Sequence, residues 1–214
     1  MPLVSLVGRE AVIVLRTIPF WVAAAAYVVL LALFVTIWGD GVPIVGGGTN
    51  WEQFIIVQWI VLLAALPWTA ARCTPPSLRD VTLFAIATAQ APSRVLLARC
   101  VALSLCLTAQ AFLALPLIVV MQRVAAVPLA DAAASLLPLA GLAIFVAVAA
   151  TASTLVCGNR VAAWIVATAC SIVLASVMPS NGTAALWLLA AALVGGPLLL
   201  RADAALTYLP ERGR

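Results

Sequence analysis

The sequence predicts an all-α, polytopic membrane protein with six transmembrane helices, an interfacial helix ahead of them and a short cytoplasmic helix between the second and the third. Of its 214 residues, 66% are hydrophobic and 8% are charged, and the mean hydropathy is +1.22. Soluble chains carry about 25% charged residues, so a soluble globule is excluded. The apolar residues also gather into runs near the roughly 20 residues that a helix needs to cross the hydrocarbon core.

Residues 1–17 are predicted to form an interfacial amphipathic helix, because this segment is too short and too charged to span a bilayer. Three polar residues fall on one side of the helical wheel and four apolar residues on the other: Ser5, Arg9 and Arg16 against Leu3, Val7, Ala11 and Val14. Glu10 lies off the polar stripe. A signal peptide is disfavoured, because the next apolar run has full span length and no convincing cleavage site.

Residues 18–214 are predicted to form one transmembrane domain. We place its six spans near residues 18–38, 51–71, 94–121, 132–156, 161–178 and 184–200. The third span is unusually long, so we expect it to tilt or protrude. Within it, Arg99 lies about 7 Å deeper than Arg94 along a helix, which is within snorkelling reach of the interface. Gly46–Gly48 follow no strand and precede no lysine, so we expect a flexible outer loop and no phosphate cradle.

The distribution of charge gives the orientation. Ten of the 11 basic residues fall on one side of this arrangement: Arg9, Arg16, Arg72, Arg79, Arg94, Arg99, Arg160, Arg201, Arg212 and Arg214. The other side holds Arg123 and the acids Asp40, Glu52 and Asp131. The positive-inside rule then places both termini in the cytoplasm. The lysine-free, alanine-rich composition indicates a GC-rich bacterial genome, so we expect the bacterial inner (cytoplasmic) membrane.

The long polar interruption at residues 72–99 is predicted to be a cytoplasmic coupling loop. Pro75 and Pro76 stop the second span, a short amphipathic helix follows over residues 78–90, and Pro92 precedes the third span. A short helix held between two spans on the inner face is a place where a soluble partner can push. The alternative is a plain interfacial segment that anchors two spans.

The composition excludes several kinds of chemistry. The chain has no Lys and no His, which removes the P-loop lysine, Schiff bases, histidine bases, zinc helices and histidine ligation of haem. Acids are absent from the middle of every predicted span, although a gradient-driven carrier usually needs one. We therefore expect no enzyme, no cofactor and no metal site in this chain, and a separate source of energy. The arginines stand singly, so we expect no nucleic-acid partner and a lipid environment instead. The five cysteines are expected to act as small apolar residues, without disulfides.

Three polar side chains within the spans are candidates for lining a pathway: Gln58, Ser104 and Thr108. Ser104 and Thr108 are four residues apart and share a helical face. Hydroxyls in such helices commonly bond the carbonyl four residues earlier, and an interhelical bond would satisfy Gln58 without a substrate. A pathway formed by these nearly uncharged spans favours an apolar or amphipathic substrate, such as a lipid or a lipid-linked molecule.

The layout resembles the membrane permeases of type-2 ABC exporters over essentially the whole chain. Their first inner loop has an acid, Gly-Thr-Leu, a helix, Pro followed by Ser-Arg, and then a Lys. This chain has Asp80, Thr82-Leu83, Pro92-Ser93-Arg94 and Arg99 at comparable places. It departs from the pattern at Val81, where the glycine is expected, at Arg99, which replaces the lysine, and at Phe84 and Ala85, where an acid is usual.

The resemblance implies contacts to a cytoplasmic ABC ATPase, which would hydrolyse ATP in a separate chain. The residues it implies for this contact are Arg79, Asp80, Thr82, Leu83, Phe84, Pro92, Ser93 and Arg94. It also implies a second permease copy or a homologue, because six spans make half of a pathway. Three alternatives stay open: a non-transporting anchor or assembly subunit, a haem-related permease of cytochrome c maturation, and a passive channel or carrier.

Overall fold

The computed structural model describes residues 2–38, 50–74, 78–177 and 184–207, and over these residues the chain forms α-helices joined by turns, with no strand. In chain order the helices of this described part are α1 (Leu3–Leu15), α2 (Ile18–Trp38), α3 (Asn50–Cys73), α4 (Leu78–Ala87), α5 (Pro92–Phe112), α6 (Leu115–Val124), α7 (Leu129–Cys157), α8 (Arg160–Val177) and α9 (Ala184–Thr207). The predicted all-α class is confirmed.

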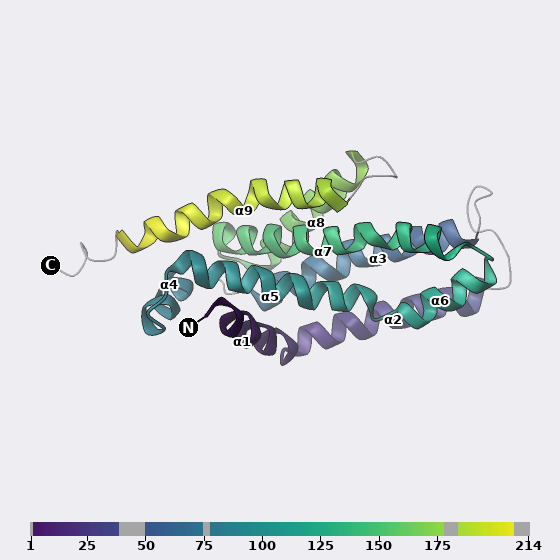
Figure 1. The fold of residues 1–214 in the computed structure, drawn as a ribbon, viewed down its shortest axis with the longest axis horizontal. Coiled ribbons are helices and arrows are strands. Elements are labelled where there is room, and N and C mark those ends of the chain that lie inside the picture. Colours follow the sequence, from purple (N-terminus) through teal and green to yellow (C-terminus); the bar gives the residue numbers. More distant parts are fainter. Residues whose placement is uncertain (1, 39–49, 75–77, 178–183, 208–214) are drawn as a thin grey trace.

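The long helices lie side by side in an elongated bundle, with α1 and α4 at one end and α6 at the other (Figure 1). Helix α7 is the central element and packs against α3, α5, α8 and α9. Alanine and glycine let neighbouring helices approach closely, and Ala143, Ala147 and Ala150 of α7 are fully buried.

Four helical stretches are long and apolar enough to cross a membrane: Ile18–Ile37, Trp51–Cys73, Pro92–Val124 and Leu129–Cys157. Two shorter apolar helices, Arg160–Ser176 and Leu186–Ala202, occupy the places of the fifth and sixth predicted spans. Large apolar side chains also face outward from the bundle, as on α2 at Val22, Val29, Leu30, Leu33 and Ile37. A surface of this kind fits a membrane-embedded protein, while the number of crossings stays a prediction.

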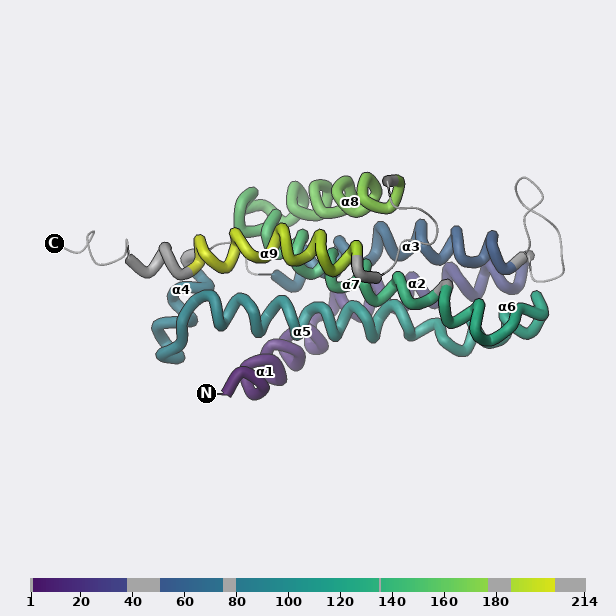
Figure 2. Tube along the Cα trace, turned by 45° about the horizontal axis from the view of Figure 1, so that its top comes forward, coloured from purple at the N-terminus to yellow at the C-terminus, as the bar shows by residue number. Residues whose placement is uncertain are grey.

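The third predicted span is interrupted rather than continuous. Helix α5 ends at Phe112 and α6 begins at Leu115, close to Pro116. Proline has no N–H to donate to the carbonyl four residues earlier, so the helical ladder breaks here. The Tyr27 hydroxyl donates to the Ala111 carbonyl in the last turn of α5 at 2.9 Å. The extra length of this segment is thus taken up by a break, after which α6 packs against α2 and α3 (Figure 2).

Helix α1 packs against the bundle through a face that the division into a polar and an apolar side did not specify. Its buried residues are Leu6, Glu10 and Val14, so only Val14 of the predicted apolar stripe is fully buried. The helical wheel divides the residues by polarity alone and takes no account of partners on other helices. Glu10 faces inward because Arg99 of α5 supplies a partner for its carboxylate.

Some predictions lie outside the described residues. These are the outer loop with Asp40 and Gly46–Gly48, the stop at Pro75 and Pro76, and the inner position of Arg212 and Arg214.

Candidate functional site: the α4 corner

Helix α4 is a short helix that lies across one end of the bundle, between α3 and α5 (Figure 1). Asp80 stands in its first turn, where a negative charge interacts favourably with the helix dipole. After Ala87 the chain reverses: the Gln90 N–H donates to the Ala85 carbonyl at 2.9 Å and the Ala89 N–H donates to the Ile86 carbonyl at 3.1 Å. This pair of bonds is a Schellman motif, and it places Ala89 in the left-handed region at φ 51°.

The inner side of α4 is apolar and fixed to the bundle. Val81 and Ala85 are buried against Val95 and Leu96 of α5 and against Ala202 of α9. Thr82 is buried on the same helix. Displacement of α4 therefore reaches both α5 and α9 directly.

The outer side of α4 exposes apolar side chains. Leu83 is 53% exposed and Ile86 is 57% exposed, and Asp80 is exposed one turn before Leu83. Residues three apart share a helical face, so Leu83 and Ile86 form one outward face, which we call the α4 outer face (Leu83 and Ile86). Such a face fits a hydrophobic groove on a partner.

Phe84 connects α4 to the N-terminal helix. The Cζ atom of Arg9 lies 4.6 Å from the centre of the Phe84 ring, a cation–π arrangement. Phe84 is half-buried and packs against the α4, α5 and α9 cluster.

Beneath α4, Glu10 and Arg99 form an ion pair that joins α1 to α5. Glu10 Oε2 lies 3.2 Å from Arg99 Nη1, and the side chains are 3% and 17% exposed. Arg99 Nη2 also donates to the Cys73 carbonyl at the end of α3, at 3.0 Å. Arg99 was predicted to lie within snorkelling reach of the interface, which stays a prediction; its guanidinium contacts α1 and α3. A cavity of about 200 Å³ between α1, α4 and α5 is lined by Glu10, Asp80, Phe84 and Arg99, among others, which leaves space behind α4.

The corner from α4 to α5 holds the remaining residues of the predicted coupling set. Pro92 is buried at the first position of α5, after Ala91 in an extended conformation, and proline is favoured at this position because its N–H needs no helical acceptor. Ser93 is half-buried, and Arg94 is exposed with its Nη1 donating to Gln90 Oε1 at 3.3 Å. Arg79 lies within α4, but its side chain is outside the described part of the structure.

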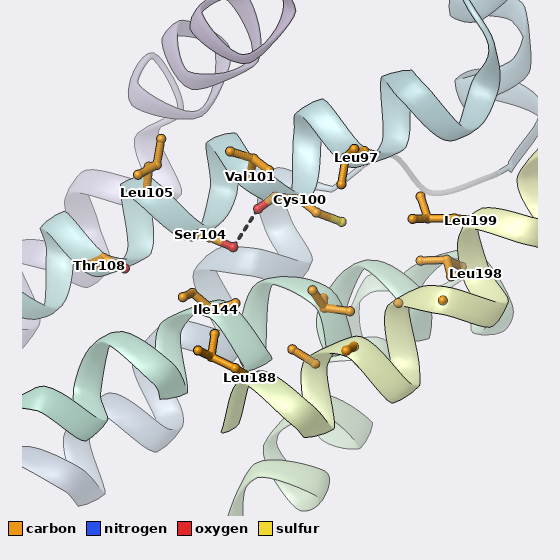
Figure 3. Close-up of a pocket in the computed structure, with 15 residues that line it drawn as sticks. Leu97, Cys100, Val101, Ser104, Leu105, Thr108, Ile144, Leu188, Leu198 and Leu199 are labelled. Atoms are coloured by element: carbon orange, nitrogen blue, oxygen red, sulfur yellow. Dashed lines mark hydrogen bonds between the residues drawn. The ribbon is translucent and has the colours of Figure 1, made fainter. Parts of the chain in front are cut away.

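The three candidate pathway residues lie in two places. Ser104 and Thr108 line a groove of about 610 Å³ between α5, α7 and α9 (Figure 3). The Ser104 hydroxyl donates to the Cys100 carbonyl at 2.7 Å. Gln58 lies in the bundle core away from this groove and donates from Nε2 to the Tyr27 hydroxyl at 2.9 Å. The role of these residues in a pathway stays a prediction.

Sequence reasoning missed the ion pair and the Tyr27 hydrogen bonds. The sequence signal for the ion pair was that Glu10 lies off the polar stripe of its helix.

No group of three or more His, Cys, Asp or Glu that could hold a metal occurs within the described residues. Comparisons with protein-family models, curated proteins and solved structures found no match to this chain.

Proposed function

We propose that this chain is the membrane permease subunit of an ATP-driven ABC transporter and that α4 is its coupling helix. The observation that carries the proposal is the α4 outer face, where Leu83 and Ile86 are exposed on a helix whose opposite side is packed into the bundle. An amphipathic helix of this kind suits a hydrophobic cleft of a soluble partner.

The surrounding charges support a cytoplasmic position for this end. Arg9 lies in α1 and Arg16 is its C-cap, Arg72 lies in the last turn of α3, and Arg94 lies in the first turn of α5. Helix α1 lies at the same end of the bundle as α4, the helix that follows α3 and precedes α5 (Figure 1). Arg123 lies at the far end, in α6. Under the positive-inside rule, α4 then faces the cytoplasm of a multi-pass protein in the bacterial inner membrane, with both termini inside.

The mechanism follows from what α4 contacts. ATP-driven closure of the partner moves α4, and the displacement reaches α5 through the Pro92 corner, α1 through Arg9 and Phe84, and α9 through Ala202. Helices that move as rigid bodies convert such a displacement into alternating access. Two permease chains form the pathway, ATP is hydrolysed by the partner, and the substrate is apolar or amphipathic.

The test is copurification of the tagged chain in mild detergent, with recovered proteins identified by mass spectrometry and by retention on immobilised ATP. Leu83→Asp places a charge on the α4 outer face without disturbing a buried contact. Phe84 is less suitable, because it packs under Arg9. Val4→Asp is the matched control, since Val4 is 82% exposed on α1 at the same end of the bundle.

We expect the wild-type chain and Val4→Asp to retain an ATP-binding protein and Leu83→Asp to lose it, with equal insertion in the membrane. If the wild-type chain recovers other membrane proteins but no ATP-binding protein, an anchor or assembly role replaces the transporter proposal. Retention by Leu83→Asp at the wild-type level would exclude α4 as the contact.

A further inference from the structure

The groove between α5, α7 and α9 is mostly apolar, with a pair of hydroxyl-bearing residues along α5 and two arginines beyond one end. It is about 610 Å³ in volume, within the range of small-molecule sites. Its walls are mostly leucine, isoleucine, valine, alanine and glycine, and Ser104 and Thr108 are its hydroxyl-bearing residues.

The length of the groove matches one leaflet of a bilayer. It extends along α5 from Leu97 to Thr108 (Figure 3), which is about 16 Å at 1.5 Å per residue. The hydrocarbon core is about 30 Å thick, so one leaflet is about half of that. An extended acyl chain is long and thin enough to lie along a groove of this length.

Two exposed arginines mark the end of the groove that is nearest α4. Arg94 precedes Leu97 by three residues on α5, and Arg201 follows Leu198 by three residues on α9. Each is therefore about one helical turn beyond the lining leucines. Guanidinium groups bind phosphate oxygens with charge-assisted hydrogen bonds, and basic residues at the membrane surface attract anionic lipids.

We propose that this groove binds one anionic phospholipid, with an acyl chain between α5, α7 and α9 and the phosphate near Arg94 and Arg201. The proposal concerns this chain alone and needs no ATPase, so it stands or falls separately from the transport function.

The test is native mass spectrometry of the full chain in mild detergent, with equal amounts of palmitoyl-oleoyl phosphatidylglycerol and palmitoyl-oleoyl phosphatidylcholine. These probes share their acyl chains and differ in head-group charge. We expect the wild-type chain to retain one phosphatidylglycerol in preference to phosphatidylcholine. Substituting Arg94→Gln and Arg201→Gln lowers that preference by about fivefold for each arginine. Arg123→Gln is the control, because Arg123 lies in α6 at the opposite end of the bundle. We expect it to leave the preference for phosphatidylglycerol unchanged.

A second pair of variants tests the groove itself. Ala192→Leu and Gly196→Leu together fill it, and a Cβ at Gly196 meets nothing within 4 Å, so the backbone need not shift. We expect the retained lipid to be lost from this double variant. Ala26→Leu adds the same group to an exposed position of α2 and should retain the lipid as the wild type does. Circular dichroism confirms that each variant keeps its helical content.

Three outcomes overturn the proposal. They are equal retention of the two lipids by the wild-type chain, retention of the lipid by the filled variant, and a wild-type chain that doubles in mass as it releases lipid. The last result would assign the groove to a second copy of the chain.

Discussion

The Glu10 and Arg99 ion pair yields a sharp prediction about stability. Removal of one partner leaves the other charge buried, since Glu10 is 3% exposed and Arg99 is 17% exposed. Breaking a buried pair in this way costs about 3–5 kcal/mol. Glu10 Oε2 and Arg99 Nε make no hydrogen bond, so the hydrogen-bonding capacity of the two groups is not fully used. We therefore take the lower end of this range, about 3 kcal/mol. We expect Glu10→Met to lower the free energy of unfolding by about 3 kcal/mol.

The expected result for the double variant separates an ion pair from two independent contacts. Arg99→Met leaves the Glu10 carboxylate unpaired and also removes the donor to the Cys73 carbonyl, so it should cost at least as much as Glu10→Met. Replacing both residues by methionine removes both charges, and replacement of a buried pair by apolar groups is often close to neutral. We therefore expect the double variant to be more stable than either single variant.

The assay is reversible unfolding in mixed micelles of a non-ionic detergent and dodecyl sulfate, followed by the fluorescence of the seven tryptophans. Arg16→Gln is the control, because Arg16 is exposed on the same end of the molecule and such surface changes stay within about 0.5 kcal/mol. A double variant that loses the sum of the two single effects would refute the coupling of these charges.

The same unfolding assay tests two further predictions. Tyr27→Phe removes the bonds to the Ala111 carbonyl and from Gln58 and should cost about 0.5–2 kcal/mol; an unchanged free energy of unfolding would mean that water replaces the hydroxyl. Ala89→Gly should stabilise the chain by up to about 1 kcal/mol, because Ala89 adopts φ 51° and glycine meets no steric cost there. Gly158→Ala, at φ 62° after α7, should lose a similar amount, and equal signs for the two substitutions would contradict the argument.

The helices were predictable because each depends mainly on local composition. Apolar runs place α2, α3 and α7, and proline at position 92 marks where α5 begins. Helix α4 ends three residues earlier than predicted, at Ala87 rather than Gln90. The helix ends in a Schellman motif whose left-handed residue is Ala89. Glycine usually occupies this position and would have indicated the helix end in the sequence, whereas alanine does not.

The pairings within the candidate site were not predictable from local pattern. Glu10 and Arg99 are far apart in the sequence, and each has an ordinary interpretation by itself: a stray acid on an amphipathic helix, and an arginine that snorkels. Likewise, Pro116 permits either a kink or a full break. The break is stabilised by Tyr27, which reaches the Ala111 carbonyl from another helix.

The groove and the α4 corner are physically connected through α9. Leu198 and Leu199 line the groove and also pack against the cluster that holds Val81 and Ala85 of α4. A lipid acyl chain in the groove would thus contact Leu198 and Leu199, which also pack against the buried side of α4. Because packed interfaces shift between discrete arrangements rather than deform continuously, lipid occupancy and the position of α4 should influence each other. The face that α4 offers to a partner would then depend on the lipid held one helix away.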